Sequence, residues 1–227
     1  MYKLISVVML MLMTSLSYAN DIYVTQSGAS LDLDITQDGQ NNTVGNSTTS
    51  SASAGASTTL NIDQIGNSNV ITYQINGATY TGVINLVGNS NNVDLNCDST
   101  GNNSSCGTAN AVINFTGNSN DIDLDIGQTS SADTADVDIV GQSGSDSNVV
   151  AATVDGNSAI LTITINGDTN NYLIDIDGNG DVNGHTLIHS HTGGTADVDI
   201  VQSGINDQYI NLTTSGDNHD IDIQQTD

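Results

Sequence analysis

Hydrophobic and polar residues alternate along most of the chain in short runs. Examples are Leu31-Asp32-Leu33-Asp34-Ile35, Ile71-Thr72-Tyr73-Gln74-Ile75, Ile122-Asp123-Leu124-Asp125-Ile126 and Ile221-Asp222-Ile223. A period of two predicts β-strands that turn Val, Ile and Leu inward and Asp, Asn and Thr outward. No convincing period of 3.6 residues, which would indicate a helix, accompanies these runs. The pattern predicts an all-β fold.

The turns between the runs are themselves periodic. Gly-Asn-Ser-Asn occurs at Gly66–Asn69, Gly88–Asn91 and Gly117–Asn120, and many glycines lie about 11 residues apart. A strand and a turn fill one such unit, so two units give one coil of roughly 22 residues, and self-similarity at this period is typical of solenoids. The segment Thr134–Val140 recurs unchanged at Thr195–Val201. We therefore predict a β-solenoid of strand-turn-strand repeats.

Three segments interrupt the period, near residues 43–57, 97–110 and 128–133. The first is rich in Ser, Thr, Ala and Gly, which favours a flexible insertion, the second is a polar loop, and the third is a shorter excursion. Solenoids tolerate insertions at the corners of their coils, because the stacked strands are not affected. We interpret these segments as loop insertions in a single domain that spans residues 20–227.

The first 19 residues have the features of a signal peptide. Lys3 is followed by an apolar stretch from Leu4 to Leu16 and by Ser17-Tyr18-Ala19, a small-x-small cleavage site. We expect cleavage after Ala19 and export of the remaining chain. The apolar stretch is too short for a transmembrane helix, and no other segment approaches the required length of about 20 residues.

The charge of the chain is one-sided. Lys3 is its only Lys or Arg, its 26 acidic residues are all Asp, and the formal net charge is −25. A chain that cannot neutralise phosphates is not expected to bind nucleic acid. The sequence contains no nucleophile elbow and no Gly-x-Ser-x-Gly motif, and acidic pairs are too frequent to single one out. We therefore predict a protein that is not an enzyme and needs no cofactor.

The repeats resemble those of the curlin family. Gln37-x-Gly39-x-x-Asn42 and Gln64-x-Gly66-x-x-Asn69 match the middle of the curlin repeat. Two other repeats keep the Gly and the Asn, and two keep the Gln-x-Gly half. These residues are Gly117 with Asn120, Gly167 with Asn170, Gln142 with Gly144, and Gln202 with Gly204.

The resemblance implies a functional amyloid of the bacterial biofilm matrix. Curli subunits form β-solenoids, leave the cell through an outer-membrane pore and polymerise with the help of a nucleator subunit. For this chain we expect a homopolymer outside the cell that serves adhesion, in which inward Asn and Gln side chains hydrogen-bond to equivalent residues of neighbouring coils. An uncapped solenoid exposes a strand edge at each end, where a further copy can add.

Three groups of residues are candidates for other chemistry. Asp175, Asp177, Asn179 and Asp181 match the beginning of an EF-hand loop, so this segment is either a site for calcium or another cation, or an ordinary Asp/Gly turn. His185, His189 and His191 share one side of a strand and form either a transition-metal site or a histidine face that is solvated or stacked. Cys97 and Cys106 are expected to form a disulfide in an exported chain.

Other functions are also compatible with an exported solenoid. The first alternative is a monomeric, calcium-dependent adhesin or binding module. A polysaccharide-degrading β-helix would share the Asp-rich coils. An ice-binding solenoid would need a regular Thr-x-Thr array, of which only Thr162-Ile163-Thr164 is present.

Overall fold

The computed structural model describes most of the chain after residue 19. The described residues are 20–27, 30–39, 41–45, 51–55, 57–66, 68–77, 79–88, 90–97, 107–117, 119–127, 134–142, 147–156, 158–177, 185–204 and 208–226. The predicted signal peptide, Gly144, Asn179, Asp181 and Cys106 lie outside them. None of the described residues forms a helix of the length and hydrophobicity that a membrane crossing requires.

In the described residues, parallel strands form two facing sheets. One sheet has eight strands: β3 (Ser30–Asp38), β6 (Ser57–Ile65), β8 (Thr79–Val87), β10 (Thr108–Thr116), β12 (Thr134–Gly141), β14 (Ala159–Asn166), β16 (Thr186–Thr192) and β18 (Tyr209–Ser215). The other has nine: β2 (Thr25–Ser27), β5 (Ser51–Gly55), β7 (Ser68–Gly77), β9 (Ser90–Cys97), β11 (Ser119–Ile126), β13 (Asn148–Asp155), β15 (Thr169–Asp177), β17 (Thr195–Ser203) and β19 (His219–Thr226). The short strands β1 (Asn20–Asp21) and β4 (Asn42–Thr43) pair with each other.

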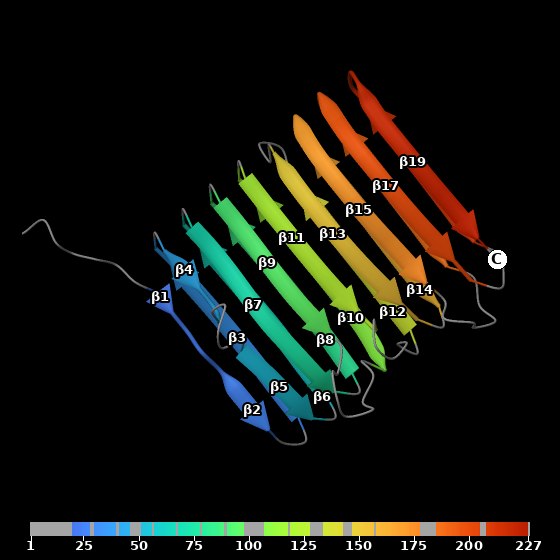
Figure 1. Ribbon diagram of the computed structural model, residues 1–227. Coiled ribbons are helices and arrows are strands. Elements are labelled where there is room, and N and C mark those ends of the chain that lie inside the picture. Colours follow the sequence, from blue (N-terminus) through green and yellow to red (C-terminus); the bar gives the residue numbers. More distant parts are fainter. Residues whose placement is uncertain are drawn as a thin grey trace, which may run out of the picture.

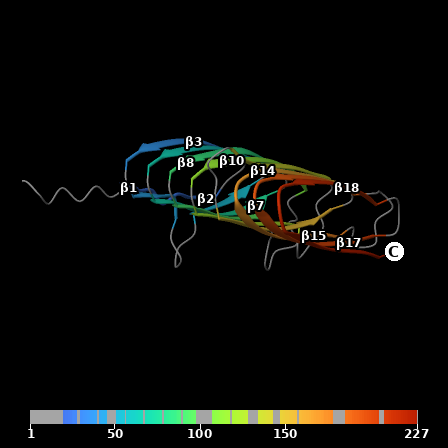
Figure 2. The same ribbon diagram turned by 90° about the horizontal axis from the view of Figure 1, so that it is seen from above.

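The chain passes from one sheet to the other and back, so each coil adds one strand to each sheet. Figure 1 shows the strands side by side in chain order, and Figure 2 shows the two layers from above. Equivalent residues of neighbouring coils are 22 residues apart where no insertion intervenes and up to 29 apart elsewhere. The predicted all-β solenoid is therefore confirmed, with coils longer than expected where they carry insertions.

The core lies between the sheets and consists of columns of equivalent side chains. One column of the eight-stranded sheet contains Ile35, Ile62, Ile84, Ile113, Ile139 and Ile163, one from each successive strand. All six are buried. Because parallel strands lie about 4.8 Å apart, each isoleucine packs on the next one along the column. The period of two in the sequence thus becomes a continuous apolar interior.

The predicted insertion at residues 43–57 is placed differently from the other two. The other two segments lie between strands of different sheets, as expected for corners, but Cys97 belongs to β9 and residues 108–110 belong to β10 instead of a loop. In contrast, β4 and β5 both lie beside β7 and together fill one strand position of the nine-stranded sheet. β5 also pairs with β2. This insertion therefore interrupts a strand position instead of a corner, and Ser51–Gly55 is a strand and not a loop.

Candidate functional site

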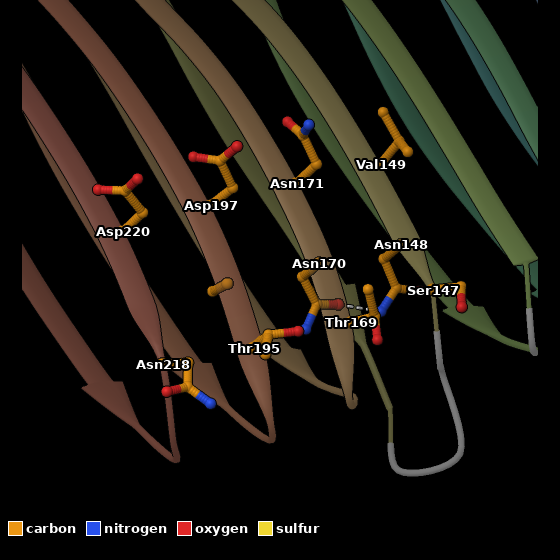
Figure 3. Close-up of a pocket in the computed structure, with 11 residues that line it drawn as sticks. Ser147, Asn148, Val149, Thr169, Asn170, Asn171, Thr195, Asp197, Asn218 and Asp220 are labelled. Atoms are coloured by element: carbon orange, nitrogen blue, oxygen red, sulfur yellow. Dashed lines mark hydrogen bonds between the residues drawn. The ribbon is translucent and has the colours of Figure 1, made fainter.

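A column of buried asparagines runs through the nine-stranded side of the core. It contains Asn42, Asn69, Asn91, Asn120, Asn148 and Asn170, which are at most 4% exposed. Asn91 Nδ2 donates to Asn120 Oδ1 at 2.5 Å, and Asn120 Nδ2 donates to Asn148 Oδ1 at 2.5 Å. Asn148 in turn donates to Asn170, which Figure 3 shows pointing toward it. We call this column the asparagine ladder.

The same asparagines also close the corners between the sheets. Asn120 Nδ2 donates to the Gly117 carbonyl at 2.9 Å, and Asn170 Nδ2 donates to the Gly167 carbonyl at 2.9 Å. The Gly-x-x-Asn spacing places the amide back over its own turn, which satisfies backbone groups that the corner would otherwise leave unpaired. The repeated Asn therefore joins neighbouring coils and shapes each corner.

Glycines stack at these corners because the backbone of one coil approaches the next too closely for a side chain. A Cβ on Gly66 would overlap the Gly39 carbonyl oxygen, and one on Gly88 would overlap the Gly66 carbonyl oxygen. The glycine amides donate across the same gap, as Gly66 N does to the Val87 carbonyl at 2.7 Å. Glycine is therefore required here for close approach.

We expect Gly88→Ala to lower the free energy of unfolding by about 2 kcal/mol, since the corner must shift to relieve the overlap. Urea unfolding of the soluble protein measures this loss. Thr81→Ala, at an exposed position of the same coil, is the control and should cost less than about 0.5 kcal/mol. Equal losses in the two variants would contradict the close-approach explanation.

The glutamines of the repeats occupy three different environments. Gln64 Nε2 donates to Gln37 Oε1 at 2.6 Å, and both side chains are buried in the eight-stranded side of the core. Gln202 is also buried, but it belongs to the other sheet, where it accepts from Gln225 Nε2 at 2.9 Å. Gln142 is exposed and therefore does not lie in the core, contrary to our expectation. Gly204, which follows Gln202, is buried at the corner.

Histidines continue the polar core toward the C-terminal end. Beyond Asn170, the next two positions in register with the asparagine ladder are Ala196 and His219. His191 reaches across from the eight-stranded sheet, with its Nδ1 atom 3.2 Å from Asn170 Nδ2 and 3.1 Å from the Tyr172 hydroxyl. The ring of His191 also lies 5.3 Å from that of His219. The ladder thus ends in imidazole groups.

The interpretation of His185, His189 and His191 as a solvated face is wrong. All three side chains are fully buried, because the register of β16 aligns Leu187 with Leu161 and Ile210 and turns the residues of this parity inward. Burial, reinforced by the neighbouring His191, lowers the pKa of His189 to about 4. Neither ring nitrogen of His189 has a hydrogen-bond partner among the described residues. No group of three or more His, Cys, Asp or Glu in the described part of the chain is placed to hold a metal ion.

The other predicted sites are described only in part. Asp175 is exposed on β15, and Asp177 accepts a hydrogen bond from Ser203 Oγ at 2.9 Å. Their partners in the calcium motif, Asn179 and Asp181, lie outside the described residues. Cys97 is buried and disulfide-bonded, and Cys106 is the other cysteine of the chain.

Many outward Asp residues lie beside uncharged residues of the neighbouring coils, and some of these neighbours are amides. Asn61 Nδ2 donates to Asp34 Oδ1 at 2.8 Å, and Asn85 Nδ2 donates to Asp63 Oδ1 at 2.7 Å. Like charges meet at a few places, for example where Asp123 lies beside Asp94. Partial burial and the nearby carboxylates raise the pKa of Asp123. A hollow on the outer surface brings together Asn171, Asp197 and Asp220 from successive strands, as Figure 3 shows.

Within the described part of the chain, the two sheets end in strands that have only one neighbouring strand. At the C-terminal end these are β18 and β19, and at the other end β3 and β2. Ile221 and Ile223 of β19 are 38% and 48% exposed, whereas their counterparts Val198 and Ile200 on β17 are at most 1% exposed. The core therefore continues, uncovered, to the C-terminal edge.

Comparisons of the chain with models of protein families, with curated proteins and with solved structures find no match.

Proposed function

We propose that this protein is the structural subunit of an extracellular, curli-like fibre and that it assembles by end-to-end stacking of strands. The observation that carries the proposal is the uncovered C-terminal edge, where inward isoleucines lack the next coil. Burying apolar surface contributes about 25 cal/mol per Å², so covering this edge favours addition of a further coil. A second copy of the chain supplies such a coil.

The edges of the eight-stranded sheet have matching side chains. When the register of the inner strands is continued, Ile210 of β18 meets Leu33 of β3, and Leu212 meets Ile35. On the outer surface, Asn211 meets Asp34, which repeats the Asn–Asp hydrogen bonding seen between β6 and β3. Addition of a copy in this register would extend both the apolar columns and the amide columns.

The chain after Lys3 also lacks two residue types that commonly prevent edge pairing, Lys and Pro. Natural edge strands are often blocked by Lys or Pro. The sequence contains no Pro, and its one cationic residue is Lys3. Continuous parallel pairing of identical coils is the arrangement found in amyloid-type fibres.

The biological setting in this proposal is supported by the sequence alone. The pattern of residues 1–19 supports export, and the Gln-x-Gly-x-x-Asn repeats support a role like that of curli in the bacterial biofilm matrix and adhesion. The corresponding partners are further copies of the chain, an outer-membrane secretion pore and a nucleator subunit. In this proposal the protein has a structural role and is not an enzyme.

The test is filament formation by the purified protein. We expect unbranched filaments with a meridional reflection at about 4.8 Å, visible by negative-stain microscopy and fibre diffraction. Ile223→Lys, at the open edge, should abolish them because each interface would bury an unpaired charge. Ile160→Lys is the matched control, since Ile160 is 41% exposed on the outer surface of β14 and away from both ends.

A protein that stays monomeric for days at high micromolar concentration would overturn the proposal. So would filaments that grow equally well from both lysine variants, because the open edge would then not be the contact.

A further inference from the structure

The two sheets differ in length by one strand. Each coil from β3 to β19 adds one strand position, or place, to each sheet. β4 and β5 together fill a single place beside β7. The ninth place of the longer sheet is taken by β1 and β2, which pair with β4 and β5 at the N-terminal end. Figure 1 shows these two strands at the blue end of the stack.

Unequal sheets cannot both continue through a stack of identical copies. If β19 of one copy paired with β1 and β2 of the next, the eight-stranded sheet would lack one strand at every junction. If instead β18 paired with β3 of the next copy, β19 would enter the place that β1 and β2 occupy. Both sheets continue only when β1 and β2 leave, because each copy then adds eight places to each sheet.

The residues of β19 match the place that would be vacated. The strand register aligns Asn20 with Asn42 and Asp21 with Thr43. The asparagine ladder begins at Asn42, and its column of equivalent positions ends at His219. Asn20 and His219 are therefore equivalent positions, as are Asp21 and Asp220. Asn20-Asp21-Ile22 therefore occupies the same positions as His219-Asp220-Ile221. Ile22 packs against the core, and its counterpart Ile221 is 38% exposed at the open end of the same column.

The N-terminal strands are also the weaker occupants of this place. β1 and β2 have 2 and 3 residues, whereas β19 has 8. Stacking without exchange would place Asp220 beside Asp21, and like charges on neighbouring strands repel. After the exchange, Asp220 lies beside Thr43, which is uncharged. Strand length therefore favours β19 as the occupant of this place, and charge favours exchange over stacking without exchange.

We infer that Asn20–Ser27, containing β1 and β2, forms a displaceable cap whose place is taken by β19 of the preceding copy during assembly. The inference rests on the proposed fibre function and adds a regulatory step to it. In the free subunit the cap covers the N-terminal edge of the nine-stranded sheet, and its release exposes that edge to the incoming β19. The recognised partner is a second copy of this chain.

The first experiment locks the cap in place. Asp21→Cys and Thr43→Cys join two aligned neighbours by a disulfide, since adjacent strands have a spacing that a disulfide spans. We expect the oxidised double variant to form filaments at least about tenfold more slowly than the same variant after reduction. The disulfide makes the subunit with a released cap, which is the form that accepts β19, scarce. The original protein with and without reductant controls for the native disulfide.

The second experiment weakens the cap. Ile22→Ser removes an apolar contact with the core and should shorten the lag before filaments appear. Tyr23→Ser is the matched control, because Tyr23 is 51% exposed and adjacent to Ile22. Equal growth of locked and reduced protein, or a lag that Ile22→Ser leaves unchanged or lengthens, would overturn the cap while leaving the fibre function intact. Absence of filaments from the original protein would overturn both.

Discussion

Replacing Asn120 with alanine is expected to lower the free energy of unfolding by about 3 kcal/mol, because a buried ladder loses its central member. The side chain accepts from Asn91 at 2.5 Å and donates to both Asn148 and the Gly117 carbonyl. Alanine removes all three hydrogen bonds and leaves polar atoms without these partners where water does not reach. Urea unfolding of the monomer measures the loss.

Asn114→Ala is the matched control for this effect. Asn114 also makes an amide hydrogen bond to a neighbouring coil, since its Nδ2 atom donates to Asn85 Oδ1 at 2.8 Å. However, it lies on the outer surface and is only half-buried, so water can replace the lost partner. We expect it to cost less than about 1 kcal/mol. Equal losses would mean that the buried ladder contributes no more than the outer one.

The fold was readily predicted because the repeated signals agree with one another. Alternation at Ile122-Asp123-Leu124-Asp125-Ile126 appears as a strand with three buried apolar residues. The Gly-x-x-Asn spacing also has a direct structural counterpart, since the glycine allows the corner and the asparagine closes it. At such positions the conformation that the local sequence favours is the same one that stacking of the coils requires.

Predictions failed where local pattern and stacking disagree. In β16 the polar residues His189 and His191 lie inward and Ile188 is 37% exposed, which reverses the usual alternation. The register with β14 and β18 decides this arrangement, and a single run of residues does not contain that information. The only local signal was Leu187, which has the same parity as the histidines.

The glutamines illustrate a second limit. Gln37, Gln142 and Gln202 all stand two residues before a glycine, yet one lies in each side of the core and Gln142 is exposed. The identical segments Thr134–Val140 and Thr195–Val201 likewise fall in different sheets, in β12 and β17. A short motif predicts a strand and a corner, but the number of residues in the preceding coils determines which sheet receives them.

Acid is expected to destabilise the C-terminal coils through His189. This residue stands between Ile163 and Leu212 in an otherwise aliphatic column, and the Tyr172 ring lies 4.4 Å away across the core. The Tyr172 ring also packs against His191, which in turn packs against His219. A protonated His189 would thus be a buried charge without a counterion among these groups.

The size of the effect follows from linkage. The pKa of His189 falls from its ordinary value of 6.5 to about 4 in the folded protein. Between these two values the unfolded chain binds the proton and the folded chain does not, so stability is complete above pH 6.5 and is lost as the pH falls to about 4. The shift corresponds to about 3 kcal/mol. Asp123 has the opposite effect on stability. Its pKa is raised in the folded protein, so the folded state binds a proton at a higher pH than the unfolded chain and gains stability as the pH falls.

His189→Leu separates the histidine from the carboxylates. Leucine continues the apolar column, so the variant should match or exceed the stability of the original protein at pH 7.5 and exceed it by about 3 kcal/mol more at pH 4. The Asp contributions are present in both proteins and cancel in the difference. Ser190→Ala, at the adjacent outward position, should shift stability equally at both pH values. Urea unfolding at a series of pH values makes the comparison, and a His189→Leu difference that does not vary with pH would show that His189 is not the group that acid acts on.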